Sequence, residues 1–323
     1  MTVYWSIARS LLLFLLCVVP PSVFSQQVGN FHLVIDGKED RPESGERGRV
    51  RIQNNTVVTD NGRLLRGAHG NCTNKVYADL SWWERMRDEF GLNVVRLDTR
   101  ITSPPDSNNL PDMKDLNAVF RDVDIAVDMA GKAGMYIVID NHTSCCGKYN
   151  AELVRRFWEV AAPRYKDRTH VIYEVQNEPV KGANYSSTAI AFQEDMYRYI
   201  RQRAPNTHII LWSAMYGANS SFLSKVESAD IDYSNASVGI HPYHWEKQDP
   251  QWQNVARLRD KHPVIINEFT TDSWKGDTDP MAIWRFAERT GLSWIALDLR
   301  DGGNHGDGVY DPNKWPVELW RKP

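Results

Sequence analysis

The sequence lacks several features that mark common protein classes. Its 323 residues include only 4 cysteines, and 38 basic against 41 acidic side chains give a formal charge of −3. This composition disfavours a disulfide-built miniprotein and a polybasic nucleic-acid-binding protein. Beyond residue 25, no apolar run approaches the roughly 20 residues that a membrane-spanning helix needs. We therefore expect neither a nucleic-acid nor a membrane partner.

Two sequence motifs are also missing. No G-x-G-x-x-G follows the first predicted strand of the repeating region, so a dinucleotide-binding fold loses its main support. No G-x-S-x-G occurs anywhere, and Ser213 in Trp212-Ser213-Ala214 has no flanking glycines. The pattern therefore disfavours a serine esterase of the α/β-hydrolase type.

The first 25 residues have the pattern of a secretory signal peptide. Arg9 precedes an apolar run from Leu11 to Val19, and a Pro-Pro pair then leads to Ser25, after which we expect cleavage. The apolar run is too short to span a bilayer. The sequence thus predicts a signal peptide over 1–25 and a secreted, extracellular mature protein.

Three cysteines follow this leader: Cys72, Cys145 and Cys146. In an oxidising compartment we expect one disulfide and one free thiol. Either Cys72 pairs with one of the two neighbours or the neighbours pair with each other, and the sequence leaves both pairings open. Adjacent cysteines lack zinc-finger spacing, which makes a metal site the less favoured interpretation.

The rest of the chain has a repeating pattern. Residues 26–49 are mixed and charged and predict an extended lead-in, and short apolar runs at 50–52 and 57–58 before Asn61-Gly62 predict an N-terminal hairpin. Eight further apolar runs predict strands at 64–68, 94–97, 136–140, 171–175, 208–212, 237–240, 264–266 and 293–299. Amphipathic stretches between them predict helices, among them 81–90, 115–133, 151–165, 188–203, 252–261 and 281–289.

Eight strand and helix units predict an α/β protein with a single (β/α)₈ TIM barrel over residues 50–323. An open doubly wound sheet would alternate in the same way. In a barrel, the chemistry lies where the strands end. The predicted ends are rich in polar side chains, including His69, Arg96, Asp140, His142, Asn177, Glu178, Ser213, His241, Asn267 and Glu268. Polar groups at buried strand ends are costly unless they face a functional cleft, so we expect the active site at this rim.

Two carboxylates at different strand ends define the expected chemistry. Glu178 and Glu268 are 90 residues apart along the chain, and a closed barrel would bring them onto one rim. Carboxyl groups about 5 to 5.5 Å apart would cleave a glycosidic bond with retention, and a wider gap would give inversion. Glu174 lies four residues before Glu178 on the same face of the strand, and we expect it to be an ion-pair partner inside the barrel.

The segment Val171 to Pro179, VIYEVQNEP, is similar to the fourth-strand signature of glycoside hydrolase family 5, the cellulase family of (β/α)₈ retaining glycosidases. Other residues at strand ends fall in the matching order, from about Val50 to the end of the chain: Arg96, His142, His241, Tyr243 and Glu268. The resemblance implies a TIM barrel that hydrolyses β-linked sugars by double displacement and needs no cofactor.

The resemblance also implies a role for each matching residue. Glu178 would be the acid/base and Glu268 the nucleophile, and Asn177 would hydrogen-bond the 2-hydroxyl of the sugar. The other residues would support them: Arg96 and Tyr243 by orienting Glu268, His241 by sitting against Glu178, and His142 by lining the adjacent subsite. His69, at the first strand end, is a further candidate substrate contact.

The eighth strand departs from the family pattern. Family members usually place a Trp beneath the sugar, and here Leu297 takes that position, while Trp294 falls on the opposite side of the strand. Leu297 could replace the platform, a bulge could bring Trp294 into place, or Trp245 or Trp274 could substitute.

These observations predict an endo-β-1,4-glucanase acting on a polysaccharide or oligosaccharide, as a monomer and without metal or organic cofactor. β-Mannan, xyloglucan and β-1,3-glucan are alternative substrates, because relatives with the same catalytic set act on them. The alternative from another class is a catalytically inactive, secreted carbohydrate-binding barrel, which the Leu297 departure favours. The two glutamates together with Asn177, Tyr243 and Arg96 favour catalysis.

Overall fold

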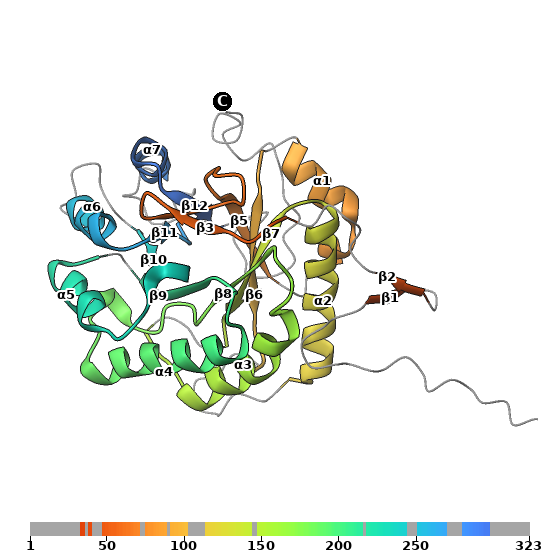
Figure 1. Cartoon of the computed structure of the whole chain (residues 1–323), viewed down its shortest axis with the longest axis horizontal. Helices are drawn as coiled ribbons and strands as arrows, with labels where there is room; N and C mark the ends of the chain where they lie inside the picture. Colours follow the sequence, from red (N-terminus) through yellow and green to blue (C-terminus); the bar gives the residue numbers. More distant parts are fainter. Residues whose placement is uncertain are drawn as a thin grey trace, which may run out of the picture.

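The computed structural model describes residues 33–35, 38–40, 47–71, 75–88, 91–102, 114–143, 147–215, 218–243, 251–269 and 280–297. Within these ranges eight parallel strands close into a barrel that helices surround (Figure 1). The strands are β5 (Arg66–Asn71), β6 (Val94–Thr99), β7 (Tyr136–Asn141), β8 (Val171–Glu174), β9 (Ile209–Met215), β10 (Ala236–His241), β11 (Val264–Ile266) and β12 (Ser293–Ala296). Their order is β10-β9-β8-β7-β6-β5-β12-β11, and a parallel pairing of β10 with β11 closes the ring. The predicted (β/α)₈ barrel is confirmed.

Helices follow most of the strands and pack around the barrel. They are α1 (Leu80–Asp88), α2 (Leu116–Lys132), α3 (Ala151–Tyr165), α4 (Ser187–Arg203), α5 (Ser220–Ser228), α6 (Gln251–Lys261) and α7 (Pro280–Thr290), with 3₁₀ turns η1 (Lys75–Ala78), η2 (Lys181–Ala183) and η3 (Tyr233–Asn235). Polar side chains start several of the helices. Asp115, Asn150 and Ser186 each accept a hydrogen bond from a backbone N–H in the first turn of the next helix. These caps satisfy donors that the first helical turn leaves unpaired.

The strands bury apolar side chains on both of their faces. The inner core of the barrel includes Val94, Tyr136, Val138, Ile172, Ile210, Ile265 and Ile295. The intervening strand residues, such as Ile137 and Ile139 in β7, pack outward against the helices. Successive side chains of a strand alternate between faces, which explains why the strand sequences are almost continuously apolar.

The N-terminal hairpin lies where β4 meets β11. Strands β3 (Arg51–Gln53) and β4 (Thr56–Val58) pair antiparallel, and Thr56 Oγ1 donates to Val264 O at 3.0 Å. The hairpin is confirmed, and its turn is formed by Asn54 and Asn55, each with φ of 50°. Asparagine tolerates this left-handed conformation, as two-residue hairpin turns require. Gly62 lies in a second turn, in which its N–H donates to Thr59 O at 3.0 Å.

The lead-in contains one feature that the sequence pattern did not predict. Strands β1 (Leu33–Ile35) and β2 (Lys38–Asp40) form a separate antiparallel pair. The predicted signal peptide at 1–25 and the chain beyond residue 297 lie outside the described residues.

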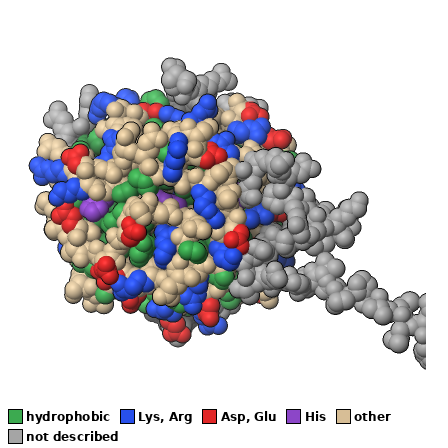
Figure 2. Space-filling model, in the orientation of Figure 1, with side chains coloured by type: hydrophobic (Ala, Val, Ile, Leu, Met, Phe, Trp, Pro, Cys, Tyr) green, Lys and Arg blue, Asp and Glu red, His purple; other side chains and the backbone are tan. Residues whose placement is uncertain are grey.

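The surface carries both signs of charge. On the face drawn in Figure 2, Lys and Arg side chains are interspersed with Asp and Glu side chains. Among the described residues, no helix is both long enough and apolar enough to cross a membrane. The mixed charge agrees with the nearly balanced composition.

Candidate functional site

Most of the predicted site residues gather at the carboxyl ends of the barrel strands. They are His69 in β5, Arg96 in β6, His142 after β7, Asn177 and Glu178 after β8, His241 at the end of β10, and Glu268 after β11. Each of these side chains is buried, with at most 8% of its residue surface exposed. Tyr243, two residues beyond β10, joins them. Parallel strands bring segments from across the chain onto one rim, as the barrel topology predicts.

Glu178 and Glu268 lie on either side of His241. Nδ1 of His241 is 2.9 Å from Glu178 Oε1 and 3.7 Å from Glu268 Oε1. A carboxylate oxygen of Glu178 and one of Glu268 lie within 4.8 Å of each other. Glu178 has φ of 42°, in the left-handed region, and its carbonyl accepts a hydrogen bond from Gly147 N at 2.9 Å. Strained backbone of this kind persists only where surrounding contacts enforce it, and it is frequent at functional sites.

Arg96 is fully buried beneath this pair and contacts three carboxylates. Its Nη1 donates to Glu268 Oε2 at 2.6 Å, and its Nε and Nη2 donate to both oxygens of Glu174 at 2.6 and 2.7 Å. Nη2 also donates to Asn177 Oδ1 at 2.7 Å and lies 3.0 Å from Asp140 Oδ2. The planar guanidinium therefore fixes the mutual positions of these side chains while offsetting part of their charge.

The surroundings of Glu268 keep it ionised. Burial alone would raise its pKa, but the charges of His241 and Arg96 outweigh burial and hold the pKa of Glu268 well below its usual range. Tyr243 Oη donates to Glu268 Oε1 at 2.5 Å. Burial and the neighbouring Glu268 charge raise the pKa of Tyr243 well above its ordinary value, so the phenol remains a donor. An ionised carboxylate surrounded by fixed donors suits a nucleophile or a stabiliser of positive charge.

The side-chain amide of Asn177 is held from both sides. Its oxygen accepts from Arg96, and its Nδ2 lies 3.2 Å from His142 Nε2. Because an amide NH₂ can only donate, His142 Nε2 accepts, and His142 Nδ1 carries the proton that faces Asp140 Oδ2 at 2.7 Å. The chain of contacts fixes which way Asn177 points.

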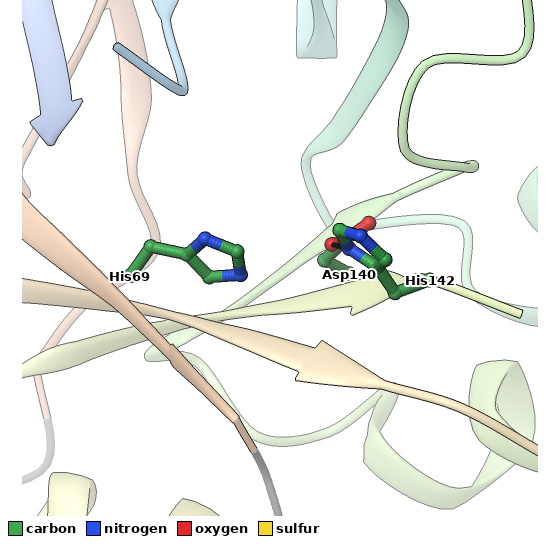
Figure 3. A group of neighbouring side chains, drawn as sticks. All are labelled: His69, Asp140 and His142. Carbon is green, nitrogen blue, oxygen red and sulfur yellow. Dashed lines mark hydrogen bonds and ion pairs between the residues drawn. The ribbon is translucent and has the colours of Figure 1, made fainter. Parts of the chain in front are cut away.

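His69, Asp140 and His142 form a trio whose ligand atoms lie within 4.8 Å of one another (Figure 3). Their spacing resembles that of a metal site, but the Arg96 guanidinium already contacts two of the three residues. Arg96 Nη1 lies 3.4 Å from His69 Nε2, and Arg96 Nη2 lies 3.0 Å from Asp140 Oδ2. Burial and the Arg96 charge lower the pKa of His69 well below its ordinary value. We therefore interpret the trio as part of the Arg96 charge network.

The eighth barrel strand, β12, shows whether Trp294 can serve as the aromatic platform beneath the sugar. Trp294 is buried in the outer layer, where its Nε1 donates to Glu288 Oε1 at 2.8 Å and its ring packs edge-on against Phe269. The alternative in which a bulge brings Trp294 under the sugar is wrong. Leu297 is half-buried on the same strand side as Ile295, which faces the barrel interior.

Several predicted residues lie outside the described part of the chain. They are Trp245, Trp274, Cys72, Cys145 and Cys146. Both the substitute platform and the disulfide pairing therefore stay predictions.

The sequence pattern indicated no role for Asp140, although this residue lies at a predicted strand end. Its alternation with His142 could have indicated the contact, since residues two apart on a strand share a face. Ser213, on β9, is a second residue without an assigned role that contacts the charge network: its Oγ donates to Glu174 Oε1 at 2.7 Å. No comparable signal marks it, because its direction depends on an irregularity in the strand.

Comparison with known protein families gives one domain match. The model of the family described as Cellulase (glycosyl hydrolase family 5) matches residues 67–303. Endoglucanase E-5 of Thermobifida fusca is 29% identical over 157 residues, which cover 47% of this chain and 33% of that protein. Endoglucanase CelA of Streptomyces lividans is 30% identical over 167 residues, covering 49% and 36%. The matched region spans about a third of the length of these two relatives.

Solved structures share the barrel. The catalytic domain of Thermobifida fusca endoglucanase Cel5A (E5) superposes with a TM-score of 0.59 and 21% identity, covering 77% of this chain and 84% of that chain. The catalytic domain of a mannanase from Streptomyces sp. SirexAA-E has a TM-score of 0.63 and 17% identity, covering 88% and 91%. At these identities the similarity establishes the fold.

Proposed function

The chain belongs to glycoside hydrolase family 5, and from that membership we propose that it is a retaining β-glycanase whose active site is the barrel rim. One observation carries the proposal: an ionised Glu268 lies beside Glu178, with carboxylate oxygens within 4.8 Å of each other. Retaining glycosidases hold their two carboxyl groups about 5 to 5.5 Å apart, whereas inverting enzymes need about 6.5 to 9.5 Å to admit a water molecule.

In the first step, Glu268 attacks the anomeric carbon while Glu178 protonates the departing glycosidic oxygen. The products are a glycosyl ester on Glu268 and a shortened sugar chain. The donors Arg96 and Tyr243 hold the two oxygens of Glu268, so the carboxylate keeps one orientation during attack.

In the second step, Glu178 takes a proton from water, and the resulting hydroxide displaces Glu268 from the sugar. Formation of the ester removes the negative charge of Glu268, which lies near Glu178. Glu178 has given its proton to the departing oxygen in the first step, so the same residue can act as base in the second. Asn177, fixed by Arg96 and His142, supports both transition states by donating to the sugar 2-hydroxyl.

The proposed substrate is a β-1,4-glucan such as cellulose, cleaved internally and outside the cell. The curated relatives named above are endoglucanases, and this similarity supports a glucan over other chains. Structural neighbours include mannanases, which share the fold with this chain. β-Mannan is therefore the first alternative to test.

The test is reducing-sugar release by residues 26–323 from soluble cellulose, β-mannan, xyloglucan, xylan and β-1,3-glucan. E268A and E84A are assayed in parallel, because Glu84 is an exposed glutamate on α1 with no part in the rim. We expect release by wild type and E84A, none by E268A, and a β-anomeric product seen first by NMR. An α-anomer would contradict retention. Binding to a glycan without release would favour the carbohydrate-binding barrel.

A further inference from the structure

Strand β9 contains an irregularity at the level of the charge network. Trp212 and Ser213 are consecutive and both left-handed, with φ of 73° and 40°. The pairing with β10 shifts at the same place, because Leu211 pairs with Val238 whereas Ala214 pairs with Ile240. Non-glycine residues in this conformation cost about 1 to 3 kcal/mol each, and they persist where the surrounding structure enforces them. The irregularity is therefore a feature that needs a physical reason.

The irregularity exchanges the directions of two side chains. In a regular strand, Trp212 would share the inward face of Ile210. Instead Trp212 packs in the outer layer against Tyr185, and its Nε1 donates to Tyr233 Oη at 2.9 Å. Ser213 takes the inward position. A small hydroxyl thus enters the space beneath the rim where regular alternation would place an indole.

The Ser213 hydroxyl connects two parts of the charge network. Its Oγ donates to Glu174 Oε1 at 2.7 Å and accepts from Asn267 Nδ2 at 3.0 Å. Ser213, Glu174 and Asn267 are all fully buried. Asn267 is the chain neighbour of Glu268, and Glu174 is bound to Arg96, which is bound to Glu268. The contacts form a closed ring. It runs from the Glu268 carboxylate through Arg96, Glu174 and Ser213 to Asn267, which is bonded to the Glu268 backbone.

Gly239 on β10 makes room for this ring. A Cβ on Gly239 would lie 2.6 Å from Asn267 Oδ1 and 2.8 Å from a methyl of Ile210. Real side chains do not approach this closely, so any larger residue would push Asn267 away from Ser213. Two separate features, the irregular β9 and the glycine on β10, therefore favour the same contact.

On the basis of the proposed function, we propose that Ser213 is a positioning residue that holds the nucleophile Glu268 in place through this ring. Ser213 acts through Glu174 and Arg96 on one side and Asn267 on the other. Without the hydroxyl, Glu174 loses a donor and the Asn267 amide loses its only partner among the described residues, so both ends of the ring become free to shift. The contact from Arg96 Nη1 to Glu268 Oε2, 2.6 Å in the intact ring, then loses the support that Ser213 gives through Glu174 and through Asn267.

The experiment compares S213A and S213G with S237A. Glycine adopts φ of 40° without strain, so S213G removes the hydroxyl and keeps the backbone even if S213A folds poorly. Ser237 is the matched control, because it is also fully buried and its Oγ lies 2.9 Å from His208 Nε2, at the other end of the barrel. Each protein is assayed for hydrolysis across pH and for labelling by a 2-deoxy-2-fluoro glycoside, which reports attack by Glu268.

We expect both Ser213 variants to lose about tenfold in kcat and in labelling rate, because a hydrogen bond to a charged group is removed, with KM little changed. The acidic limb of kcat/KM should move to higher pH, since Glu268 is held less firmly by Arg96. S237A should lose stability and keep the wild-type kcat, labelling rate and pH profile. This separation of effects would support the positioning role.

Two results would overturn the proposed role of Ser213, and both can be told apart from a result that refutes the proposed glycosidase function. Wild-type kcat, labelling and pH profile in both Ser213 variants would show that the ring does not position Glu268. Losses of activity in the Ser213 variants that only match their unfolded fraction would show a structural role. In both cases an active wild type beside an inactive E268A leaves the glycosidase assignment intact. A wild type that neither hydrolyses any glycan nor becomes labelled would refute both proposals.

Discussion

The two ends of the barrel bury the same kinds of charged side chain in different proportions. At the amino end, Arg168 precedes β8 and forms an ion pair with Asp128. At the carboxyl end, Arg96 faces three carboxylates, two of which are Glu174 and Glu268. The Arg168–Asp128 pair joins one positive charge to one negative charge. The arrangement around Arg96 leaves an excess of negative charge that neighbouring protonated groups must offset.

Two buried histidines show the consequence. His208, before β9, contacts Asn235 and Ser237, and burial lowers its pKa to about 3. His241 is equally buried, yet the charges of Glu268 and Glu178 outweigh burial and raise its pKa. Burial therefore lowers the pKa of His208, whereas the charges of Glu178 and Glu268 leave the pKa of the buried His241 raised. Chemistry is expected where burial and unbalanced charge coincide.

Removal of the acid at the carboxyl end should give the largest effect. E178A should lower kcat/KM on polysaccharide by about 10³- to 10⁴-fold, because the glycosidic oxygen then departs without a proton. An aryl glycoside with a good leaving group should lose far less in the first step. Steady-state kinetics on both substrates tests this expectation, and equal losses would contradict the acid assignment of Glu178. The midpoint of thermal unfolding should change little.

The same substitution at the two ends tests the comparison directly. R96K should lower kcat/KM by about 10²- to 10³-fold and move the acidic limb of its pH profile to higher pH. The reason is that an ammonium lacks the planar fork with which Arg96 donates to both oxygens of Glu174 and to Glu268 at once. R168K should lower the free energy of unfolding by about 1 to 3 kcal/mol, since one paired guanidinium is replaced. R168K should also keep the wild-type pH profile. Kinetics and urea unfolding of both variants are the measurements. A change in the pH profile of R168K would show that the two ends are coupled.

Protonation of the buried His208 should account for part of the loss of stability at acidic pH. Its pKa of about 3 in the folded protein lies below the ordinary value of 6.5, so the unfolded chain takes up this proton first as pH falls. The stabilising contribution is therefore complete above pH 6.5 and is lost as pH falls from 6.5 towards 3, by up to about 5 kcal/mol. H208Q should show a flatter dependence in urea unfolding at pH 7, 5 and 4. His262, which is half-buried, gives the control H262Q, with a smaller change expected. Parallel curves for wild type and H208Q would refute the assignment.

The sequence alone was sufficient to predict the barrel and the polar residues at the carboxyl ends of its strands. Apolar runs of strand length end in polar residues such as Arg96, His142 and Glu268, and closed parallel strands bring such ends together. Alternation also placed Trp294 on the outer face and Leu297 on the inner one. These predictions need only the period of a strand, which is the same at every position of a regular strand.

Features that depend on irregular backbone could not be predicted from the sequence. Alternation alone would turn Trp212 inward, and the two left-handed residues in β9 reverse this and bring Ser213 under Glu174. The hairpin turn at Asn54 and Asn55 was missed for a different reason, because the nearby Asn61-Gly62 pair gives a stronger turn signal. Side-chain period cannot locate a bulge, since a bulge is stabilised by contacts that form only after distant strands meet.

The smallest effects are expected from substitutions on the outer and inner faces of β12. W294F removes the indole donor to Glu288 and should lower the free energy of unfolding by about 1 to 2 kcal/mol. Because Trp294 lies in the outer layer, kcat and KM should remain at wild-type values. L297A is the partner variant: its side chain is half-buried on the inward face, so it should change KM more than stability. Urea unfolding and glycan hydrolysis of both variants test this difference. A raised KM in W294F would mean that the outer face of β12 reaches the substrate, and the distinction between a structural and a functional face would then fail on this strand.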